Sequence, residues 1–204
     1  MINLIFATNN AHKVEEIRGK LPGAFHIMSL SEAGIHIDIP EPYETLEENA
    51  SEKSRTINAL TGQNCFSEDT GLEVNVLGAE PGVRSARYAG DHGSTEENIQ
   101  KLLHKMEGKR DRSARFRTVI SLQLNGTEYL FEGICQGQIL EAKRGTGGFG
   151  YDPVFVPDGS AKSFGEMSLD EKAIYSHRAK AVEAMAQFLR ELIPQKFLEK
   201  GIKS

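Results

Sequence analysis

The sequence lacks the features that define several large classes of protein. None of its apolar stretches reaches the ~20 residues that a membrane-spanning helix needs. Positive charge is not in excess, because 24 lysines and arginines stand against 29 aspartates and glutamates, which gives a formal net charge of −5. A broad basic surface for nucleic acid polymers is therefore not expected, and a small anionic ligand would need local positive charge.

Cysteine is also scarce, and no leader segment stands out. Cys65 and Cys135 lie far apart in apolar segments, and neither belongs to a C-x-x-C pair of the kind that binds zinc or exchanges electrons. We therefore expect two buried thiols in a reducing compartment. The chain opens directly on the apolar run from Ile2 to Ala7, without a basic region or a cleavage signature, so we expect a cytoplasmic protein.

The sequence does contain alternating strand and helix patterns, without repeats or low-complexity tracts. Its 204 residues, 39% hydrophobic and 26% charged, are enough to bury the core of one domain spanning 1–204. Residues 2–8 are typical of a buried strand and residues 11–21 of an amphipathic helix. Three later helices are predicted to begin at capping boxes: Thr45 with Glu48, Ser94 with Glu97, and Ser168 with Glu171.

Two long strand patterns are joined by an Asn-Gly pair. Residues 114–124 and 127–140 flank Asn125 and Gly126, which is the strongest hairpin signal in a short stretch of sequence. Together with the helices, these strands predict an α/β fold in which a long, mixed, bent central sheet carries helices on its flanks.

Two charged residues lie on faces that should be apolar. Lys53 falls on one helix stripe and Arg178, next to His177, falls on another. A buried charge needs a partner, so Lys53 either snorkels past the helix end or faces a site, and Arg178 either forms an internal salt bridge or contacts an anionic or carbonyl-rich ligand. The two stripes are Leu46, Ala50, Ile57 and Leu60, and Ile174, Ala181, Met185 and Leu192.

The motif TNNAHK connects the first strand to the first helix. Thr8, Asn9 and Asn10 would place short polar side chains at a helix N-terminus, where free backbone N–H groups favour phosphate, and Lys13 would add a point charge. The same residues are also common as a helix cap and a surface lysine. The stretch TNNAHK itself contains no P-loop or G-x-G-x-x-G pattern.

A pair of acids lies between two strand patterns, 64–67 and 71–77. Glu68 and Asp69, followed by Thr70 and a glycine, are therefore predicted to occupy a tight turn. A solvated turn explains them, but carboxylates at a strand end near a phosphate site would also bind Mg²⁺, whose octahedron the substrate phosphates complete. Glu41 is a further candidate ligand.

The stretch GGFGYDPVFVP, residues 147–157, surrounds two aromatic rings with glycines. Glycines allow close approach of the backbone to a ligand, and the rings of Phe149 and Tyr151 offer flat faces, so we expect a flat ligand between them.

Six motifs together resemble the inosine triphosphate pyrophosphatase family, the Ham1-like purine nucleoside triphosphate pyrophosphatases. In family order they are FATNNAHK, ENA with Lys53, SEDTGLEV, PGVRSARYAG, GTGGFGYDPVF and EKAIYSHRAKA, and they span nearly the whole chain. The resemblance implies two lobes with the active-site cleft between them. It also implies Mg²⁺-dependent hydrolysis of aberrant purine triphosphates, ITP, dITP and XTP, to the monophosphate and pyrophosphate by a homodimer, which cleanses the nucleotide pool.

The resemblance also implies roles for individual residues. Asp69 would be the essential acid, which holds the metal or activates water, with Glu68 beside it where many members have aspartate. Either Asp69 or Glu68 would deprotonate the attacking water, and Asp69 and Glu41 would hold the metal. Asn9 stands where many members have glycine. The triphosphate would contact the first loop and Lys53, and Thr70 would be a further substrate contact. The purine would contact the glycine-rich loop, Lys172 would contact a phosphate or the base, and His177 with Arg178 would read the 6-oxo edge of the purine. The implied substrate-binding residues are Thr8, Asn9, Asn10, Lys13, Thr70, Phe149, Gly150, Tyr151, Asp152, Lys172, His177 and Arg178, and the implied catalytic residues are Asp69, Glu68 and Lys53.

Two other functions fit part of this pattern. A non-catalytic nucleotide sensor could use the same loop and rings, but extra carboxylates near phosphates serve a binder only where a metal is held. A Maf-like pyrophosphatase for modified pyrimidines shares the substrate logic but would lack the Ser-His-Arg motif at 176–178.

Overall fold

The computed structural model describes residues 2–10, 13–14, 17, 21 and 25–192. The chain forms two compact units, the first from Met1–Asp69, Val119–Gly133 and Arg178–Ser204, and the second from Thr70–Thr118 and Ile134–His177. No helix in the described ranges is long and apolar enough to cross a membrane. The helix expected over 11–21 lies partly outside the described residues, but Lys13, Val14 and Ile17 are helical, and Val14 and Ile17 are buried as the pattern predicted.

The described strands form one seven-stranded sheet with the order β2-β1-β3-β5-β6-β7, and β4 pairs with β3. Strand β1 lies parallel to both β2 and β3, whereas the pairs β3–β4 and β6–β7 are antiparallel, so the sheet is mixed. The strands are β1 Ile2–Phe6, β2 Phe25–Ser29, β3 Cys65–Val74, β4 Pro81–Gly82, β5 Ser113–Leu124, β6 Thr127–Ile139 and β7 Phe155–Pro157.

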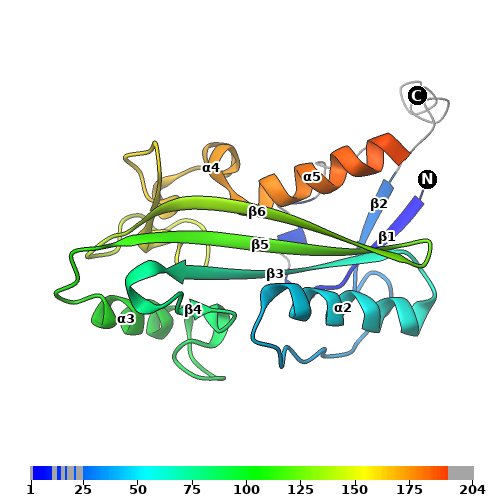
Figure 1. Ribbon diagram of the computed structural model, residues 1–204, viewed down its shortest axis with the longest axis horizontal. Coiled ribbons are helices and arrows are strands. Elements are labelled where there is room, and N and C mark those ends of the chain that lie inside the picture. Colours follow the sequence, from blue (N-terminus) through cyan, green and yellow to red (C-terminus); the bar gives the residue numbers. More distant parts are fainter. Residues whose placement is uncertain (1, 11–12, 15–16, 18–20, 22–24, 193–204) are drawn as a thin grey trace. The chain divides into compact units, whose positions relative to one another are not determined.

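The long strands β5 and β6 lie side by side, drawn in green in Figure 1. Asn125 and Gly126 join them with φ of 52° and 81°, the left-handed pair that a two-residue hairpin of this kind requires. The hairpin predicted from the Asn-Gly pair is therefore confirmed. The sequence placed two short strands around Glu68 and Asp69, and this was wrong, because β3 runs without interruption through both acids.

Helix starts follow the predicted caps. Ser94 and Ser168 form complete capping boxes with the glutamates three residues later, and the Thr45 side chain accepts the Glu48 N–H. The predicted stripes hold at Leu46, Ala50 and Ile57 and at Ala181 and Met185, which are buried. They fail at Leu60, Ile174 and Leu192, which are more than half exposed. The helices are α2 Leu46–Thr61, α3 Thr95–Lys105, α4 Leu169–Tyr175 and α5 His177–Leu192, and the expected continuation toward Phe197 lies outside the described residues.

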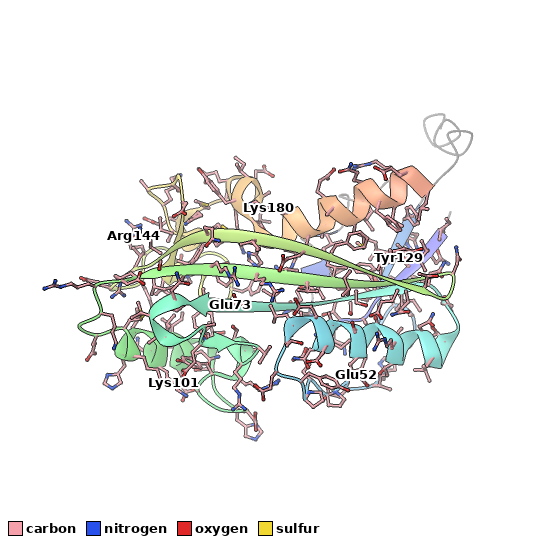
Figure 2. The ribbon with its side chains drawn as sticks, viewed as in Figure 1. Glu52, Glu73, Lys101, Tyr129, Arg144 and Lys180 are labelled. Carbon is pink, nitrogen blue, oxygen red and sulfur yellow. The ribbon has the colours of Figure 1, made fainter. Side chains whose placement is uncertain are left out.

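In the first unit, α2 and α5 cover opposite faces of the sheet (Figure 1). Successive strand residues point to opposite faces, so Leu4 and Phe6 join α5 in one hydrophobic cluster while Ile5 joins α2 in another. Tyr129 on β6 lies below α5 in Figure 2, with its ring 4.4 Å from that of Phe188. This two-sided burial determines where each residue of β3 points.

The second unit has a core of its own. Apolar residues of β3, β5 and β6 pack there with α3 and with the segment 151–164. Three phenylalanines form its centre, since the ring of Phe116 lies 4.7 Å from that of Phe155 and 6.1 Å from that of Phe164. The glycine-rich loop is thus anchored to a rigid core at its C-terminal end.

Candidate active site

Strand β3 separates the two predicted acids. Glu68 and Asp69 are consecutive residues in the middle of an extended strand, so their side chains point to opposite faces of the sheet. Both are buried, with 2% and 6% of their surfaces exposed, which excludes the solvated turn. Because each carboxylate meets a different helix, the two have different partners and different electrostatics.

Asp69 shares its face of β3 with Cys65 and Ser67, and all three contact α2. The Cys65 thiol donates to the Ser54 carbonyl at 3.1 Å, the Ser67 hydroxyl donates to the Ala50 carbonyl, and Lys53 Nζ lies 3.3 Å from Asp69 Oδ1. Polar contacts thus fix α2 against the strand along its length, and they hold Lys53 in place. Lys53 is 7% exposed and does not snorkel to solvent.

The Lys53 ammonium group bridges two carboxylates. Besides Asp69 Oδ1, its Nζ donates to Glu41 Oε1. Burial disfavours the Lys53 charge, but Asp69 and Glu41 outweigh this and raise its pKa, so the side chain stays an ammonium. Burial raises the pKa of Asp69, and the negative charge of Glu41 adds to this, whereas Lys53 and Lys13 oppose it without reversing it.

Glu68, on the opposite face, is an ion-paired carboxylate. Arg178 Nε donates to both of its oxygens, at 3.0 and 2.8 Å, and Lys13 Nζ lies 3.1 Å from Oε1. Burial by itself would raise the pKa of Glu68, but the two cations outweigh it and hold the pKa well below its usual range. A carboxylate so stabilised is a weak base. The sequence left open whether Arg178 forms an internal salt bridge or contacts a ligand. In the structure it forms a salt bridge with Glu68.

The loop before Lys13 has the form of a helix start. The Asn10 side chain accepts the Lys13 N–H at 3.3 Å, and the Asn10 carbonyl accepts the Val14 N–H at 3.2 Å, so Asn10 serves as the helix cap. Its own N–H donates to the Thr8 hydroxyl at 3.1 Å. Asn9 and Asn10 are exposed, so the predicted phosphate-binding residues are accessible to a ligand.

The donor set of this unit fits Mg²⁺. The Asp69 Oδ2 oxygen is buried and has no hydrogen-bond partner among the described residues, so it can accept a cation. Glu41 Oε1 is connected to the other Asp69 oxygen through Lys53. No group of three potential metal ligands occurs in the described part of the chain, but Mg²⁺ commonly takes only one or two carboxylates and completes its octahedron with water and substrate phosphate.

In the second unit, Asp152 organises the glycine-rich loop. Its Oδ2 accepts the Phe149 N–H at 2.9 Å and the Lys172 ammonium at 2.8 Å. Lys172 Nζ also lies 4.7 Å from the centre of the half-buried Phe149 ring. Gly148 is required here, because its φ is +74° and a Cβ would lie 2.0 Å from Asp152 Oδ2. The structure thus brings Phe149, Asp152 and Lys172 together, as predicted for one subsite.

Tyr151 departs from the predicted arrangement. Its side chain is 4% exposed within the core of the unit, and its hydroxyl donates to the Ser85 carbonyl at 2.9 Å. The expected stacking of a ligand between Phe149 and Tyr151 is therefore wrong for this structure, since the Tyr151 ring is enclosed by other side chains. Gly150 next to it has φ of +60° and open space around its Cβ position.

The remaining predicted residues of the second unit have structural contacts. Thr70 and Thr118 share a hydrogen bond of 2.8 Å between their hydroxyls, and His177 is 3% exposed and stacks on Phe116 with 4.7 Å between ring centres. Phe116 is a residue that sequence reasoning missed, although the alternation in ARFRTV was a signal that it points inward.

Comparison with known proteins shows where this chain belongs. A sequence profile of the Ham1 family matches residues 4–188. The chain belongs to the Ham1 family. One relative, the dITP/XTP pyrophosphatase of Christiangramia forsetii, is 48% identical over 188 residues, which cover 92% of this chain and 99% of the relative. The dITP/XTP pyrophosphatase of Porphyromonas gingivalis is 47% identical over 190 residues, covering 93% of this chain and 98% of the relative.

Solved Ham1 structures have the same fold. The Ham1 protein of Staphylococcus aureus superposes with a TM-score of 0.86 at 36% identity, covering 93% of this chain and 98% of that one. The HAM1 protein of Coxiella burnetii superposes with a TM-score of 0.88 at 34% identity, covering 94% and 100%. The predicted mixed α/β class, with a curled mixed sheet and flanking helices, is confirmed, and the match over 4–188 includes every predicted site residue.

Proposed function

We propose that this chain is a dITP/XTP pyrophosphatase, which hydrolyses ITP, dITP and XTP to the nucleoside monophosphate and pyrophosphate. Its relatives of 47–48% identity carry that name, and they match it over nearly their whole length. The observation that carries the chemistry is the buried Asp69, which has two lysines close by and one oxygen that accepts no hydrogen bond from any described residue. A pure binding protein would use such a carboxylate near phosphates only to hold a metal.

The first unit would bind the triphosphate. Thr8, Asn9 and Asn10 offer short polar side chains at a helix start, and Lys13 and Lys53 supply positive charge beside Asp69. Phosphoryl transfer asks mainly for positioning and for neutralisation of charge, which these groups can provide without a covalent nucleophile. Thr70, consecutive with Asp69, would add a hydroxyl contact.

Asp69 and Glu41 would hold Mg²⁺, on the donor set described above. A bound Mg²⁺ would polarise phosphate oxygens and offset the negative charge that develops on them. Asp69 takes the proton of the attacking water, the resulting hydroxide attacks the α-phosphorus, and pyrophosphate leaves. Asp69 is favoured over Glu68 as this base, because Arg178 and Lys13 hold the pKa of Glu68 low, whereas Asp69 Oδ2 accepts no hydrogen bond from any described residue.

The second unit would bind the purine. Phe149 offers one stacking face, and Lys172, held by Asp152, supplies a donor next to it. Gly150 would allow the backbone to approach the base, and Tyr151 would support the loop from the core rather than stack. His177 and Arg178 would recognise the 6-oxo group, since imidazole and guanidinium nitrogens can donate hydrogen bonds to a carbonyl oxygen.

Selectivity would come from hydrogen bonds rather than from stacking. A site built to hydrogen-bond a substrate group can reject an analogue that lacks it by ~10⁴-fold, against ~10- to 200-fold for a missing methylene. The 6-oxo group separates hypoxanthine and xanthine from adenine, so ATP should be a poor substrate. We further propose that one nucleotide contacts both sets of residues. The subunit would be a single domain, and two subunits would form a cytoplasmic homodimer.

The test is a substrate panel with identified products. The protein is incubated with Mg²⁺ and ITP, XTP, dITP, ATP, GTP or a modified pyrimidine triphosphate, and monophosphate and pyrophosphate are quantified. We expect IMP and pyrophosphate from ITP, and far slower reaction with ATP. Nucleotide binding without any IMP would indicate the sensor, and a preference for the modified pyrimidine would indicate the Maf-like activity. Either result overturns the proposal.

A further inference from the structure

The Lys53 ammonium group lies where a cation shared by the two proposed metal ligands would be expected. It contacts Glu41 Oε1 and Asp69 Oδ1 at the same time, and both Lys53 and Asp69 are more than nine-tenths buried. Little water screens the charges of Lys53 and Asp69, so the position of the ammonium group strongly affects the attraction that Asp69 exerts on another cation.

We propose that Lys53 occupies the metal position until the nucleotide arrives, so that Mg²⁺ binds together with the triphosphate and only weakly on its own. This inference rests on the proposed function, because it needs a triphosphate to which Lys53 can transfer its contacts. It makes Lys53 a positioning residue for the metal in addition to a contact for phosphate.

The charge balance supports this order of binding. Two carboxylates alone would attract a divalent cation with two negative charges, but Lys53 between them cancels one, and Lys13 further lowers the negative potential at Asp69. A triphosphate brings several negative charges, which offer Lys53 new partners and leave both carboxylates to the metal. Nucleotide and metal should therefore each raise the affinity for the other, by the same factor.

The side chain is suited to such a transfer. Lysine carries a compact charge on a flexible four-carbon stem, so its ammonium group can change partners while α2 stays in place. Lys53 also leaves Asp69 only partly paired, because the buried Asp69 Oδ2 has no hydrogen-bond partner among the described residues. A metal ion could satisfy that oxygen, which the lysine leaves unsatisfied.

The test measures metal binding in the absence of turnover. Binding of Mn²⁺ and Mg²⁺ is titrated by calorimetry, without nucleotide and with an ITP analogue that cannot be hydrolysed between the α- and β-phosphates. We compare the unmodified protein with Lys53→Met, and with Lys13→Met as the matched control. Lys13→Met removes the same charge from beside Glu68, which is not a proposed ligand. Lys13 acts on Asp69 without a hydrogen bond to it, so this variant should gain less metal affinity than Lys53→Met.

Without nucleotide, we expect Lys53→Met to bind the metal at least about tenfold more tightly than the unmodified protein, equivalent to about 1.4 kcal/mol. The gain in metal affinity that the analogue causes should be large in the unmodified protein and much smaller in Lys53→Met. Mg²⁺ alone should also raise the melting temperature of Lys53→Met more than that of the unmodified protein.

Unchanged or weaker metal binding by Lys53→Met, or an equal gain in Lys13→Met, would overturn the inference. If Lys53→Met does not fold, Lys53→Gln takes its place. The unmodified protein alone can also reject the inference: its metal affinity would then be the same with and without the analogue. Failure of the proposed function is separate, because it shows as absence of ITP hydrolysis by the unmodified protein, whereas metal titration without nucleotide reports on Lys53 alone.

Discussion

At the scale of single residues, Glu68 and Asp69 differ in role because they differ in partners. Glu68 is bonded to Arg178 and Lys13 on one face of β3, whereas Asp69 keeps one buried oxygen without a partner in the described chain on the other. Glu68, whose carboxylate is occupied by two cations, is suited to hold Arg178 and Lys13 in place. Asp69, whose pKa is raised, is suited to take a proton. The two acids can therefore be separated by mutation.

Asp69→Asn should lower kcat for ITP hydrolysis by ~10²- to 10⁴-fold, since it removes the proposed base. Pyrophosphate release at saturating Mg²⁺ measures this directly. Glu68→Gln, assayed in parallel under conditions where it is folded, should retain more activity than Asp69→Asn. Near-normal pyrophosphate release by Asp69→Asn would show that Asp69 is not the base.

Glu68→Gln should instead lower the stability of the protein. It leaves the guanidinium of Arg178, which is 1% exposed, without its carboxylate, and breaking a buried ion pair costs about 3–5 kcal/mol. Urea unfolding at neutral pH measures the loss. The control is Glu73→Gln, labelled on β3 in Figure 2, whose pairs with Arg115 and Arg117 are partly exposed and should contribute about 0–1 kcal/mol. Equal losses in both variants would contradict this account of Glu68.

Phe149 and Tyr151 should likewise separate binding from stability. Phe149→Ala should raise KM for ITP, because base stacking contributes about 1–3 kcal/mol, and should change unfolding little. Tyr151→Phe leaves the Ser85 carbonyl without its donor and should cost about 1–3 kcal/mol of stability with a much smaller effect on KM. Steady-state kinetics and urea unfolding of both variants provide the comparison, and a KM effect of Tyr151→Phe as large as that of Phe149→Ala would restore the two-ring arrangement.

At the scale of elements, the contact between α2 and the sheet is polar as well as apolar. Ser54 and Ser121 share a hydrogen bond of 2.7 Å, Gln123 donates to Ser54 at 3.1 Å, and Ser121 donates to Glu128 at 2.8 Å. Hydrogen bonds demand one register, whereas apolar contacts tolerate small shifts. This network therefore contributes to the placement of Lys53, which directly precedes Ser54 on the helix.

Glu128 connects this network to a testable pH dependence. Burial opposes its charge, but Ser51, Arg55 and Ser121 outweigh this and lower the pKa of Glu128 in the folded state. Its contribution to stability is therefore present above the unfolded pKa of about 4.3 and is lost as pH falls through the folded value. Glu128→Gln should cost about 1 kcal/mol at pH 7. In urea unfolding, the difference from the unmodified protein should shrink as the pH falls toward about 3, and a constant difference would contradict the assignment.

Local signals in the sequence were enough for much of the fold. Asn125-Gly126 and the serine caps act within a few residues, so the hairpin and the helix starts could be predicted from them. The course of β3 could not, because Glu68 and Asp69 are tolerated in a buried strand only where Arg178 and Lys53, distant in sequence, neutralise them. Tyr151 was misplaced for the same reason, since its partner Ser85 lies on another segment.

At the scale of the whole molecule, the boundaries between the two units fall within the predicted motifs. Asp69 ends a segment of the first unit and Thr70 begins one of the second. His177 ends a segment of the second unit and Arg178 begins one of the first. Each motif therefore supplies consecutive residues to both units. The proposed function requires one nucleotide to contact residues of both motifs.

Hydrogen exchange with whole and partial ligands tests this consequence. Mg²⁺ with pyrophosphate should protect amides of the first unit around Lys13 and Lys53, and IMP should protect amides of the second around Phe149 and Lys172. A non-hydrolysable ITP analogue with Mg²⁺ should protect both sets with a single midpoint in the same titration. Protection of only one unit by the analogue, or two separate midpoints, would mean that the two clusters do not bind one molecule, because a single bound ligand saturates all its contacts together.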